Sequence, residues 1–209
     1  MVRRVYVVPH AEATHHLEHV VGGWHDSALT PDGHLAAMKI AAALRQAIPS
    51  GAMAELYSSD LKRAAQTAAP IGELLGLKPV IDARLREKSY GEAEGRPQAW
   101  LDARFIRPPV TGDRMNHEEG IAGAETIAAF ARRIYAALDD ILTSRCEHQV
   151  IVSHGGASSV LIAAWIKMPV DSLGYARFTA GPGSITTLTE DDFFCNRRVD
   201  CLGDTRHLD

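Results

Sequence analysis

Cysteine is scarce in this chain of 209 residues, which contains only Cys146, Cys195 and Cys201. An odd and sparse set of thiols argues against a disulfide framework and is typical of a protein in a reducing compartment. No pair of cysteines has the close spacing of a structural zinc site. We therefore predict a cytoplasmic protein whose three thiols are unpaired.

Long hydrophobic runs and an excess of positive charge are also missing. Only four apolar residues follow Arg4, which is too short for a signal peptide or a membrane span, and no other run approaches about 20 apolar residues. The net charge is −4, with a pI near 6.2. Nucleic-acid and acidic-membrane binders are usually more basic, so we expect neither partner.

The chain is 46% hydrophobic and 23% charged, which is typical of a globular protein. Its length suits one domain over residues 1–209, with a cap insertion at about 92–123. That insertion is rich in Gly, Pro, Arg and Glu and has weak periodicity, which indicates an irregular partial lid rather than a second domain.

Predicted strands alternate with predicted helices along the rest of the chain. Thr30 and Pro31 are typical of a helix start, Ser59 is the expected cap of the second helix, and Pro70 is expected to break that helix. The alternation predicts an α/β fold, a three-layer α/β/α sandwich with a mostly parallel sheet and helices on both faces. The expected strands are 3–8, 54–59, 78–85, 149–154, 183–190 and an edge strand in 193–201; the expected helices are 30–48, 59–76, 123–144 and 157–168.

Two of the strands end in a histidine. "VVPH" ends at His10 and "IVSH" ends at His154, 144 positions later. Functional sites of such sheets collect at the carboxyl ends of the strands. This gives a physical reason to expect the two imidazoles in one site.

Six segments, in the same order, resemble the histidine phosphatase superfamily, the phosphoglycerate mutase-like group. The resemblance covers nearly the whole chain, and six matches in the correct order are far more specific than one. The segments are "PHAEATHH", "GGWHDSALTPDGH", "YSSDLKRAAQTA", "LREKSYGEAEG", "GAETIAAFARR" and "VSHGGASSVL".

The resemblance implies phosphoryl transfer through a phosphohistidine. His10 would be the nucleophile, His154 a donor to the phosphoryl oxygens, Arg63 a guanidinium clamp, and Glu87 the acid for the leaving oxygen. No metal or cofactor is implied, because protein cations balance the charge. The remaining residues implied to bind phosphate are His16, Gly23 and Gly155.

Each assignment has a simpler alternative. Either histidine could be an ordinary polar contact, and Arg63 could be a solvated helix residue. Glu87 could pair with a neighbouring cation, namely Arg84, Arg86 or Lys88. The three histidines His15, His16 and His19 could hold a metal, although no ligand pattern supports this.

The first motif departs from the family at two positions. Pro9 replaces the arginine before the nucleophile, which removes a cation; loss of one transition-state donor typically costs about 10²–10³ in rate. Ala11 replaces the following glycine and disfavours any positive φ that the loop needs. His16 replaces a phosphate-contacting asparagine, and in protonated form it would return a charge, so that phosphate affinity would fall as pH rises.

We expect a metal-independent phosphomonoesterase or phosphotransferase with a remodelled pocket, acting on a small-molecule phosphomonoester or a related anionic metabolite. One alternative is a different acid–base reaction on a small anion with less charge; another is a non-catalytic binding protein. The balanced charges of the cap favour a phosphatase over a mutase. A homodimer is a further expectation, through an exposed edge strand near Thr187 or a helical face.

Overall fold

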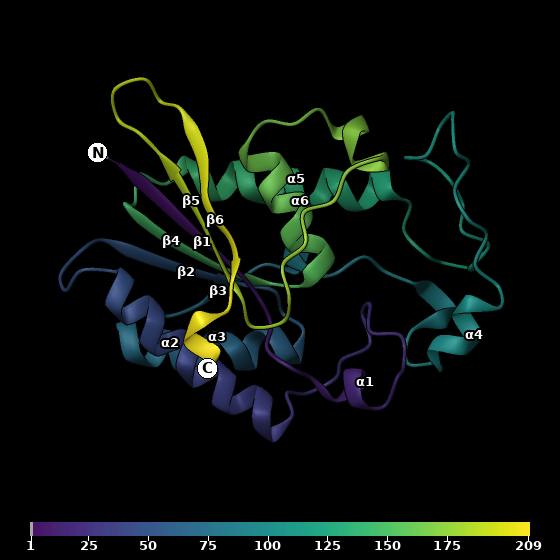
Figure 1. Ribbon diagram of the computed structural model, residues 1–209, viewed down its shortest axis with the longest axis horizontal. Helices are drawn as coiled ribbons and strands as arrows, with labels where there is room; N and C mark the ends of the chain where they lie inside the picture. The colour runs from purple at the N-terminus through teal and green to yellow at the C-terminus, as the bar shows by residue number, and fades with distance from the viewer. Residues whose placement is uncertain (1) are drawn as a thin grey trace.

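A six-stranded sheet forms the centre of the computed structural model, which describes residues 2–209 (Figure 1). The strand order is β3-β2-β4-β1-β5-β6. The first four of these strands run parallel, and β5 and β6 join antiparallel. The strands are β1 Arg3–Pro9, β2 Ala54–Ser58, β3 Val80–Ile81, β4 His148–Ser153, β5 Ile185–Glu190 and β6 Arg197–Asp204.

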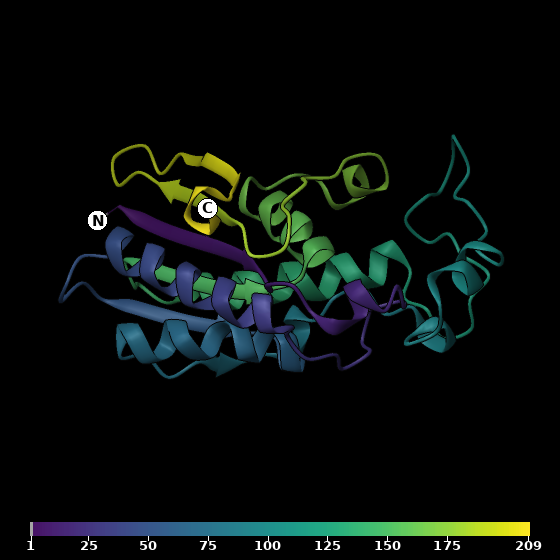
Figure 2. The same ribbon diagram turned by 60° about the horizontal axis from the view of Figure 1, so that its bottom comes forward.

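Helices cover both faces of this sheet, which confirms the predicted three-layer α/β fold (Figure 2). The helices α2 Pro31–Ala47 and α3 Lys62–Leu75 pack on one face. The helices α5 Ile127–Thr143 and α6 Gly155–Trp165 pack on the other. The shorter elements are α1 Thr14–Leu17, α4 Gln98–Asp102 and the 3₁₀ turns η1 Ala83–Leu85, η2 Gly91–Ala93, η3 Val170–Gly174 and η4 Arg206–Leu208.

Strand β1 shows why its sequence is apolar throughout. Successive side chains of a strand point to opposite faces, and both faces are covered here. Val5 and Val7 pack into the core under α5 and α6, whereas Tyr6 and Val8 pack under α2 and α3. A central strand between two helical layers therefore carries His10 out of the core at its carboxyl end.

Two expectations about α3 were wrong. The N-cap is Leu61, not Ser59, and the helix passes through Pro70 and ends at Gly76, which has φ +68°. Ser59 lies two residues before this cap, where its hydroxyl accepts the N–H of Leu61 at 3.3 Å and lies 2.9 Å from Nε2 of His154. A proline removes one helical hydrogen bond, but the buried neighbour Ile71 keeps the helix packed on the sheet.

The edge of the sheet also differs from the expectation. Thr187 lies in β5, which is hydrogen-bonded to β1 on one side and to β6 on the other, so it is not an edge residue. The chain turns back after β5, and β6 covers that edge as the expected last strand. Thr187 is therefore not on the exposed edge that was expected to support a dimer, and dimerisation itself stays a prediction.

The segment 92–123 contains the short helix α4 and is otherwise irregular. It lies beyond the strand ends, at the α4 end of the molecule in Figures 1 and 2. A small separate core of Val21, Ala93, Leu101 and Ile121 supports it. The segment thus lies next to the strand ends that carry the histidines, and its role as a cap over the site stays a prediction.

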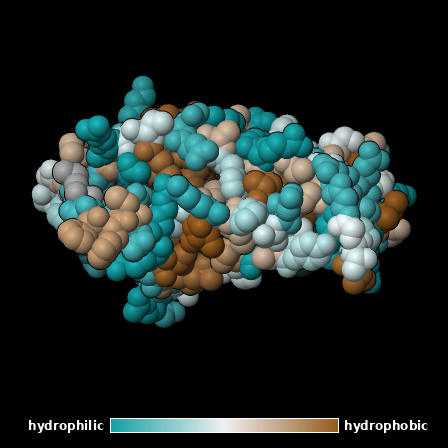
Figure 3. Space-filling model, turned by 90° about the horizontal axis from the view of Figure 1, so that it is seen from above, coloured by the Kyte–Doolittle hydropathy of each residue, from teal (hydrophilic) through white to brown (hydrophobic). Residues whose placement is uncertain are grey.

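The described cysteines Cys146, Cys195 and Cys201 are all unpaired. Within residues 2–209, every helix is too short or too polar to cross a bilayer. On the face drawn in Figure 3, apolar residues form separate patches between polar ones.

Candidate active site

The two strand-ending histidines lie side by side. β1 and β4 are adjacent and parallel, and Pro9 is in register with Ser153. The rings of His10 and His154 therefore meet edge to face, with 5.1 Å between their centroids. The sequence predicts this contact correctly, because both residues follow the last position of a neighbouring strand.

Both ring nitrogens of His10 have a defined partner. Nδ1 lies 2.7 Å from the carbonyl oxygen of Ala11, and Nε2 accepts a hydrogen bond from Nε of Arg63 at 3.1 Å. A carbonyl can only accept, so the proton sits on Nδ1 and Nε2 keeps its lone pair. Burial, and then the charge of Arg63, hold the pKa of His10 well below its usual range. His10 is thus a neutral imidazole that carries its proton on Nδ1 and is basic at Nε2.

Arg63 is buried at the start of α3 and is held in place by two carbonyl groups. Its Nη1 donates to the carbonyl of His25 and its Nη2 to that of Gly23, both at 2.7 Å. Burial lowers its pKa to about 10, so it remains a cation at neutral pH. Only 1% of the side chain is exposed, which excludes the alternative of a solvated helix arginine.

Gly23 plays a different part from the one expected. Its backbone has φ +47°, and its carbonyl oxygen holds Arg63. A carbonyl oxygen repels phosphate, and Gly23 does not line the cavity described below. Its predicted phosphate contact stays a prediction, while its contact in the structure is with Arg63.

The carboxylate of Glu87 lies at the amino end of α6. Its Oε2 accepts a hydrogen bond from the backbone N–H of Gly156 at 2.7 Å, and its Oε1 accepts one from the N–H of Lys88. A Cβ at Gly156 would collide with this carboxylate. The glycine is therefore required for the close approach of Glu87.

The cations near Glu87 in sequence all have other partners. Arg84 pairs with Asp82 and Asp140, Arg86 with Asp60, and Lys88 with Glu119. The alternative of a surface ion pair for Glu87 is thus wrong. Because these cations form ion pairs with other carboxylates, Glu87 has no ion-pair partner among them and lines the cavity described below.

His154 is fully buried against the ring of His10. Its Nε2 is 2.9 Å from the hydroxyl of Ser59, and among the described residues its Nδ1 has no hydrogen-bond partner. Burial and the neighbouring His10 and Arg63 keep its pKa well below its usual range. A buried nitrogen without a partner costs stability, which is common at functional sites.

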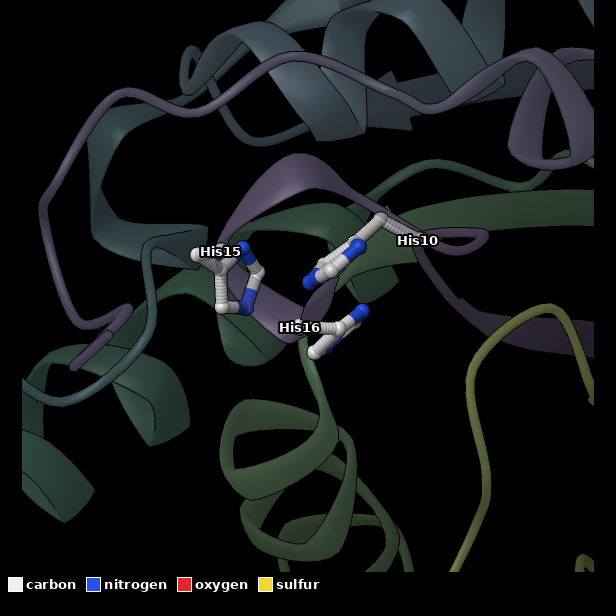
Figure 4. A group of neighbouring side chains, drawn as sticks. All are labelled: His10, His15 and His16. Carbon is white, nitrogen blue, oxygen red and sulfur yellow. The ribbon is translucent and has the colours of Figure 1, made fainter. Parts of the chain in front are cut away.

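One ring nitrogen from each of His10, His15 and His16 lies within 4.8 Å of the other two (Figure 4). This group differs from the cluster considered from the sequence, because His19 is exposed. It suits a cation poorly. Arg63 already donates to Nε2 of His10, and Nδ1 of His16 accepts the N–H of Ala13, which puts the proton of neutral His16 on Nε2.

That same hydrogen bond changes the interpretation of His16. Its ring stacks on His10 with 5.6 Å between centroids, and burial and Arg63 lower its pKa. Both effects oppose the expected protonated form of His16, which stays a prediction. A neutral His16 with its proton on Nε2 still offers one donor to an anion held at His10.

The two departures in the first motif are accommodated without strain. The pairing of β1 with β5 ends at Val7, two residues before Pro9. No hydrogen bond to β5 therefore requires an N–H at Pro9. Ala11 is not among the described residues with positive φ, and its N–H bonds to Thr67. The concern about its backbone conformation was wrong; the missing cation at Pro9 remains.

A cavity of about 510 Å³ opens above His10. It brings Arg63, Glu87, Gly155 and His16 together as the sequence predicts, and Arg177 joins them. Arg177 forms no hydrogen bond or ion pair with any residue of 2–209. The other lining residues are Pro9, His10, His15, Gly156, Phe178, Thr179, Ala180 and Pro182.

Sequence reasoning missed two groups of this site. Arg133 donates to the carbonyls of Arg84, Arg86 and Glu87, and so holds the Glu87 segment against α5. Arg133 stands in the matched segment "GAETIAAFARR", which was a usable signal. Arg177 lies in a loop without periodicity, and no local pattern marks it.

The sheet order, the paired histidines and the buried arginine define an α/β protein with a histidine and arginine site at the strand ends. The family model of the histidine phosphatase superfamily (branch 1) matches residues 5–200, so the chain belongs to this superfamily.

Individual relatives agree. The chain is 31% identical over 211 residues to the "Probable phosphoglycerate mutase GpmB" of Yersinia enterocolitica, covering 99% of this chain and 95% of the relative. The native structure of the mycobacterial glucosyl-3-phosphoglycerate phosphatase is similar with a TM-score of 0.78 and 26% identity, covering 98% and 100% of the two chains. The structure of Bacillus stearothermophilus YhfR is similar with a TM-score of 0.79 and 25% identity, covering 99% and 100%. These names support an enzyme of the histidine phosphatase type.

Proposed function

We propose that the protein hydrolyses a small phosphomonoester through a phosphohistidine on His10. The observation that carries the proposal is the state of His10. Its Nδ1 proton is held by the carbonyl of Ala11, while its Nε2 lone pair points to the guanidinium of Arg63. A neutral imidazole with an unprotonated Nε2 beside a buried cation is what attack on a phosphoryl group needs.

In the first step, the Nε2 lone pair of His10 forms a bond to phosphorus and the bond from phosphorus to the ester oxygen breaks. Glu87, acting as the general acid, gives a proton to that oxygen, and the alcohol leaves. In the second step, water attacks the phosphohistidine, Glu87 takes the proton, and the bond from phosphorus to Nε2 breaks. Inorganic phosphate leaves and His10 is restored.

Charge on the phosphoryl group is balanced by donors already in place. Arg63 exchanges its hydrogen bond to His10 for one to a phosphoryl oxygen, and its two carbonyl contacts keep it oriented. The unpartnered Nδ1 of His154 gains an acceptor in the same oxygens. Because these groups are supplied by the chain, the mechanism uses no metal or cofactor.

Arg177 takes over the charge that Pro9 does not provide. It lines the same cavity as Pro9 and His10, and it is free of ion pairs with the described residues. A guanidinium suits phosphate because its planar fork can donate two parallel hydrogen bonds. The site therefore keeps two arginines although its first motif lacks one.

Hydrolysis is favoured over a mutase reaction by the cap. A mutase must hold a bisphosphate, which requires free cations around the site. In the cap, the guanidinium groups of Arg96 and Arg104 lie over the ring of Trp100, at 4.8 and 4.2 Å from its centroid. Arg114 lies over Tyr175. These arginines are engaged with aromatic rings rather than with the cavity.

The test is phosphate release from a panel of phosphomonoesters at pH 6, with wild-type and His10→Ala protein measured side by side. We expect release by the wild type and loss of at least about 10³-fold in the variant, since no other group can form the intermediate. Trapping of ³²P on the wild type, acid-labile and absent from His10→Ala, would identify the phosphohistidine.

Equal release by both proteins would overturn the proposal. Turnover of a non-phosphorylated anion, with no phosphate release, would favour the second candidate, an acid–base reaction. Pro9 is the observation that favours that candidate, because one family cation is missing from its usual place.

A further inference from the structure

A second cavity, of about 310 Å³, adjoins the first. The two share Glu87, Gly156 and Arg177 as lining residues. Glu87 is the proposed acid for the leaving oxygen, so that oxygen must lie where the two cavities meet. The alcohol part of the substrate, which continues beyond the oxygen, then has the second cavity as its place.

The walls of the second cavity are mainly apolar. They come from the cap, α5, α6 and the chain around η3, and consist of Phe105, Ile127, Phe130, Val160, Leu173 and Ala176. Apolar walls favour the binding of apolar groups, because these groups leave water. They do not favour hydroxyl or carboxylate groups, which lose their hydrogen bonds to water.

The charged pair Lys88 and Glu119 and the hydroxyl of Ser159 already have partners within the protein. Lys88 and Glu119 form an ion pair at 2.7 Å, with about a tenth of each side chain exposed. The hydroxyl of Ser159 accepts the N–H of Phe178. Tyr90 presents its ring to the ammonium of Lys88, at 4.4 Å from the centroid. Of the charged residues, only Arg177 at the junction is left for an anion.

We propose that the second cavity is the leaving-group site and selects phosphomonoesters of apolar, ring-bearing alcohols. This inference rests on the proposed phosphatase function and adds the substrate class. Polar alcohols with a carboxylate, such as those in the names of the relatives above, would place their charge against apolar side chains there.

The experiment compares 3-phenylpropyl phosphate with O-phosphoserine, both esters of primary alcohols. We expect kcat/KM to be at least about 10-fold higher for the apolar ester. Ala176→Phe narrows the second cavity at a residue that does not line the first, and should lower kcat/KM for 3-phenylpropyl phosphate about 10-fold or more. The value for O-phosphoserine, whose smaller alcohol fills less of the cavity, should fall by less than about 3-fold. The matched control is Ala42→Phe, on the exposed face of α2, which should change neither value.

Binding separates this inference from the proposed function. Titration calorimetry with the non-hydrolysable 4-phenylbutylphosphonate should show tighter binding than with methylphosphonate, and Ala176→Phe should remove the difference. If the phosphonate result holds but no ester is hydrolysed in a His10-dependent way, the phosphatase proposal fails and the cavity assignment stands. If His10-dependent hydrolysis occurs without preference for the apolar ester, or Ala176→Phe affects both esters alike, the inference is overturned.

Discussion

At the scale of single residues, the protein is notable for a proline directly before its proposed nucleophile. Pro9 contributes neither a side-chain donor nor an N–H to the cavity. The strand tolerates it because pairing with β5 has already ended at Val7. The structure offers Arg177 as the replacement cation, which approaches from the loop before β5 and not from β1.

This replacement predicts the behaviour of a pair of variants. Arg177→Ala should lower kcat/KM for a phosphomonoester by about 10- to 100-fold, as expected for loss of a charge-assisted contact of about 1.5–3 kcal/mol. Adding Pro9→Arg to Arg177→Ala should recover at least part of that loss, since the cation returns from the other side. Steady-state kinetics of the two variants and the wild type checks this.

A matched control is Arg107→Ala, because Arg107 is in the cap and lines neither of the two cavities. Wild-type kinetics for Arg177→Ala would show that Arg177 does not contact the substrate.

At the scale of secondary-structure elements, the amino end of α6 organises the acid. The helix begins directly after His154, so its first N–H groups point toward the site. One of them, from Gly156, binds the carboxylate of Glu87. The positive end of the helix dipole adds to this attraction. A single helix start thus positions both a buried histidine and the proposed acid.

This geometry makes Gly156→Ala a test of the acid. The added methyl would displace the Glu87 carboxylate, and we expect kcat to fall by about 10²-fold, as for loss of a general acid. The loss should be smaller for aryl phosphates, whose leaving group needs less help from a proton. Rates with phenyl and alkyl phosphates measure the difference.

Gly155→Ala is the comparison, since a Cβ at Gly155 meets no atom within 4 Å. We expect an effect of at most a few-fold there. Equal losses in the two variants would mean that the helix start as a whole was disturbed, and would contradict the specific contact with Glu87.

At the scale of the whole molecule, the buried histidines of the site make the stability of the fold depend on pH. Burial lowers the pKa of His15 to about 3 and holds the pKa values of His10 and His154 well below 6.5. An unfolded chain binds protons on these rings from about pH 6.5 downward, where the folded protein does not. Stability is therefore complete above about pH 6.5 and decreases as pH falls below it.

We accordingly predict that the free energy of unfolding decreases between pH 7 and pH 5. Each buried neutral histidine contributes at most about 1.4 kcal/mol per pH unit to the slope. His10→Asn should reduce the slope by up to that amount. Urea denaturation at several pH values checks this, and identical slopes for His10→Asn and the wild type would contradict it.

The sequence by itself determined the α/β class, most element positions and the meeting of His10 with His154. Those features follow from local periodicity and from the rule that parallel strands end at one edge. Arg63 and Glu87 were predicted from motifs of the family. A motif can indicate that residues distant in sequence meet in the fold.

Only the tertiary structure decided the proton positions on His10 and His16, the partners of Gly23, and the place of Thr187 inside the sheet. It alone revealed Arg177 and the second cavity. Arg177 and the second cavity depend on irregular segments, distant in sequence, that pack over the strand ends. Irregular segments have no hydrophobic periodicity from which their packing could be predicted. The proposed reaction centre was thus predictable from the strands, whereas the groups proposed to select the substrate were not.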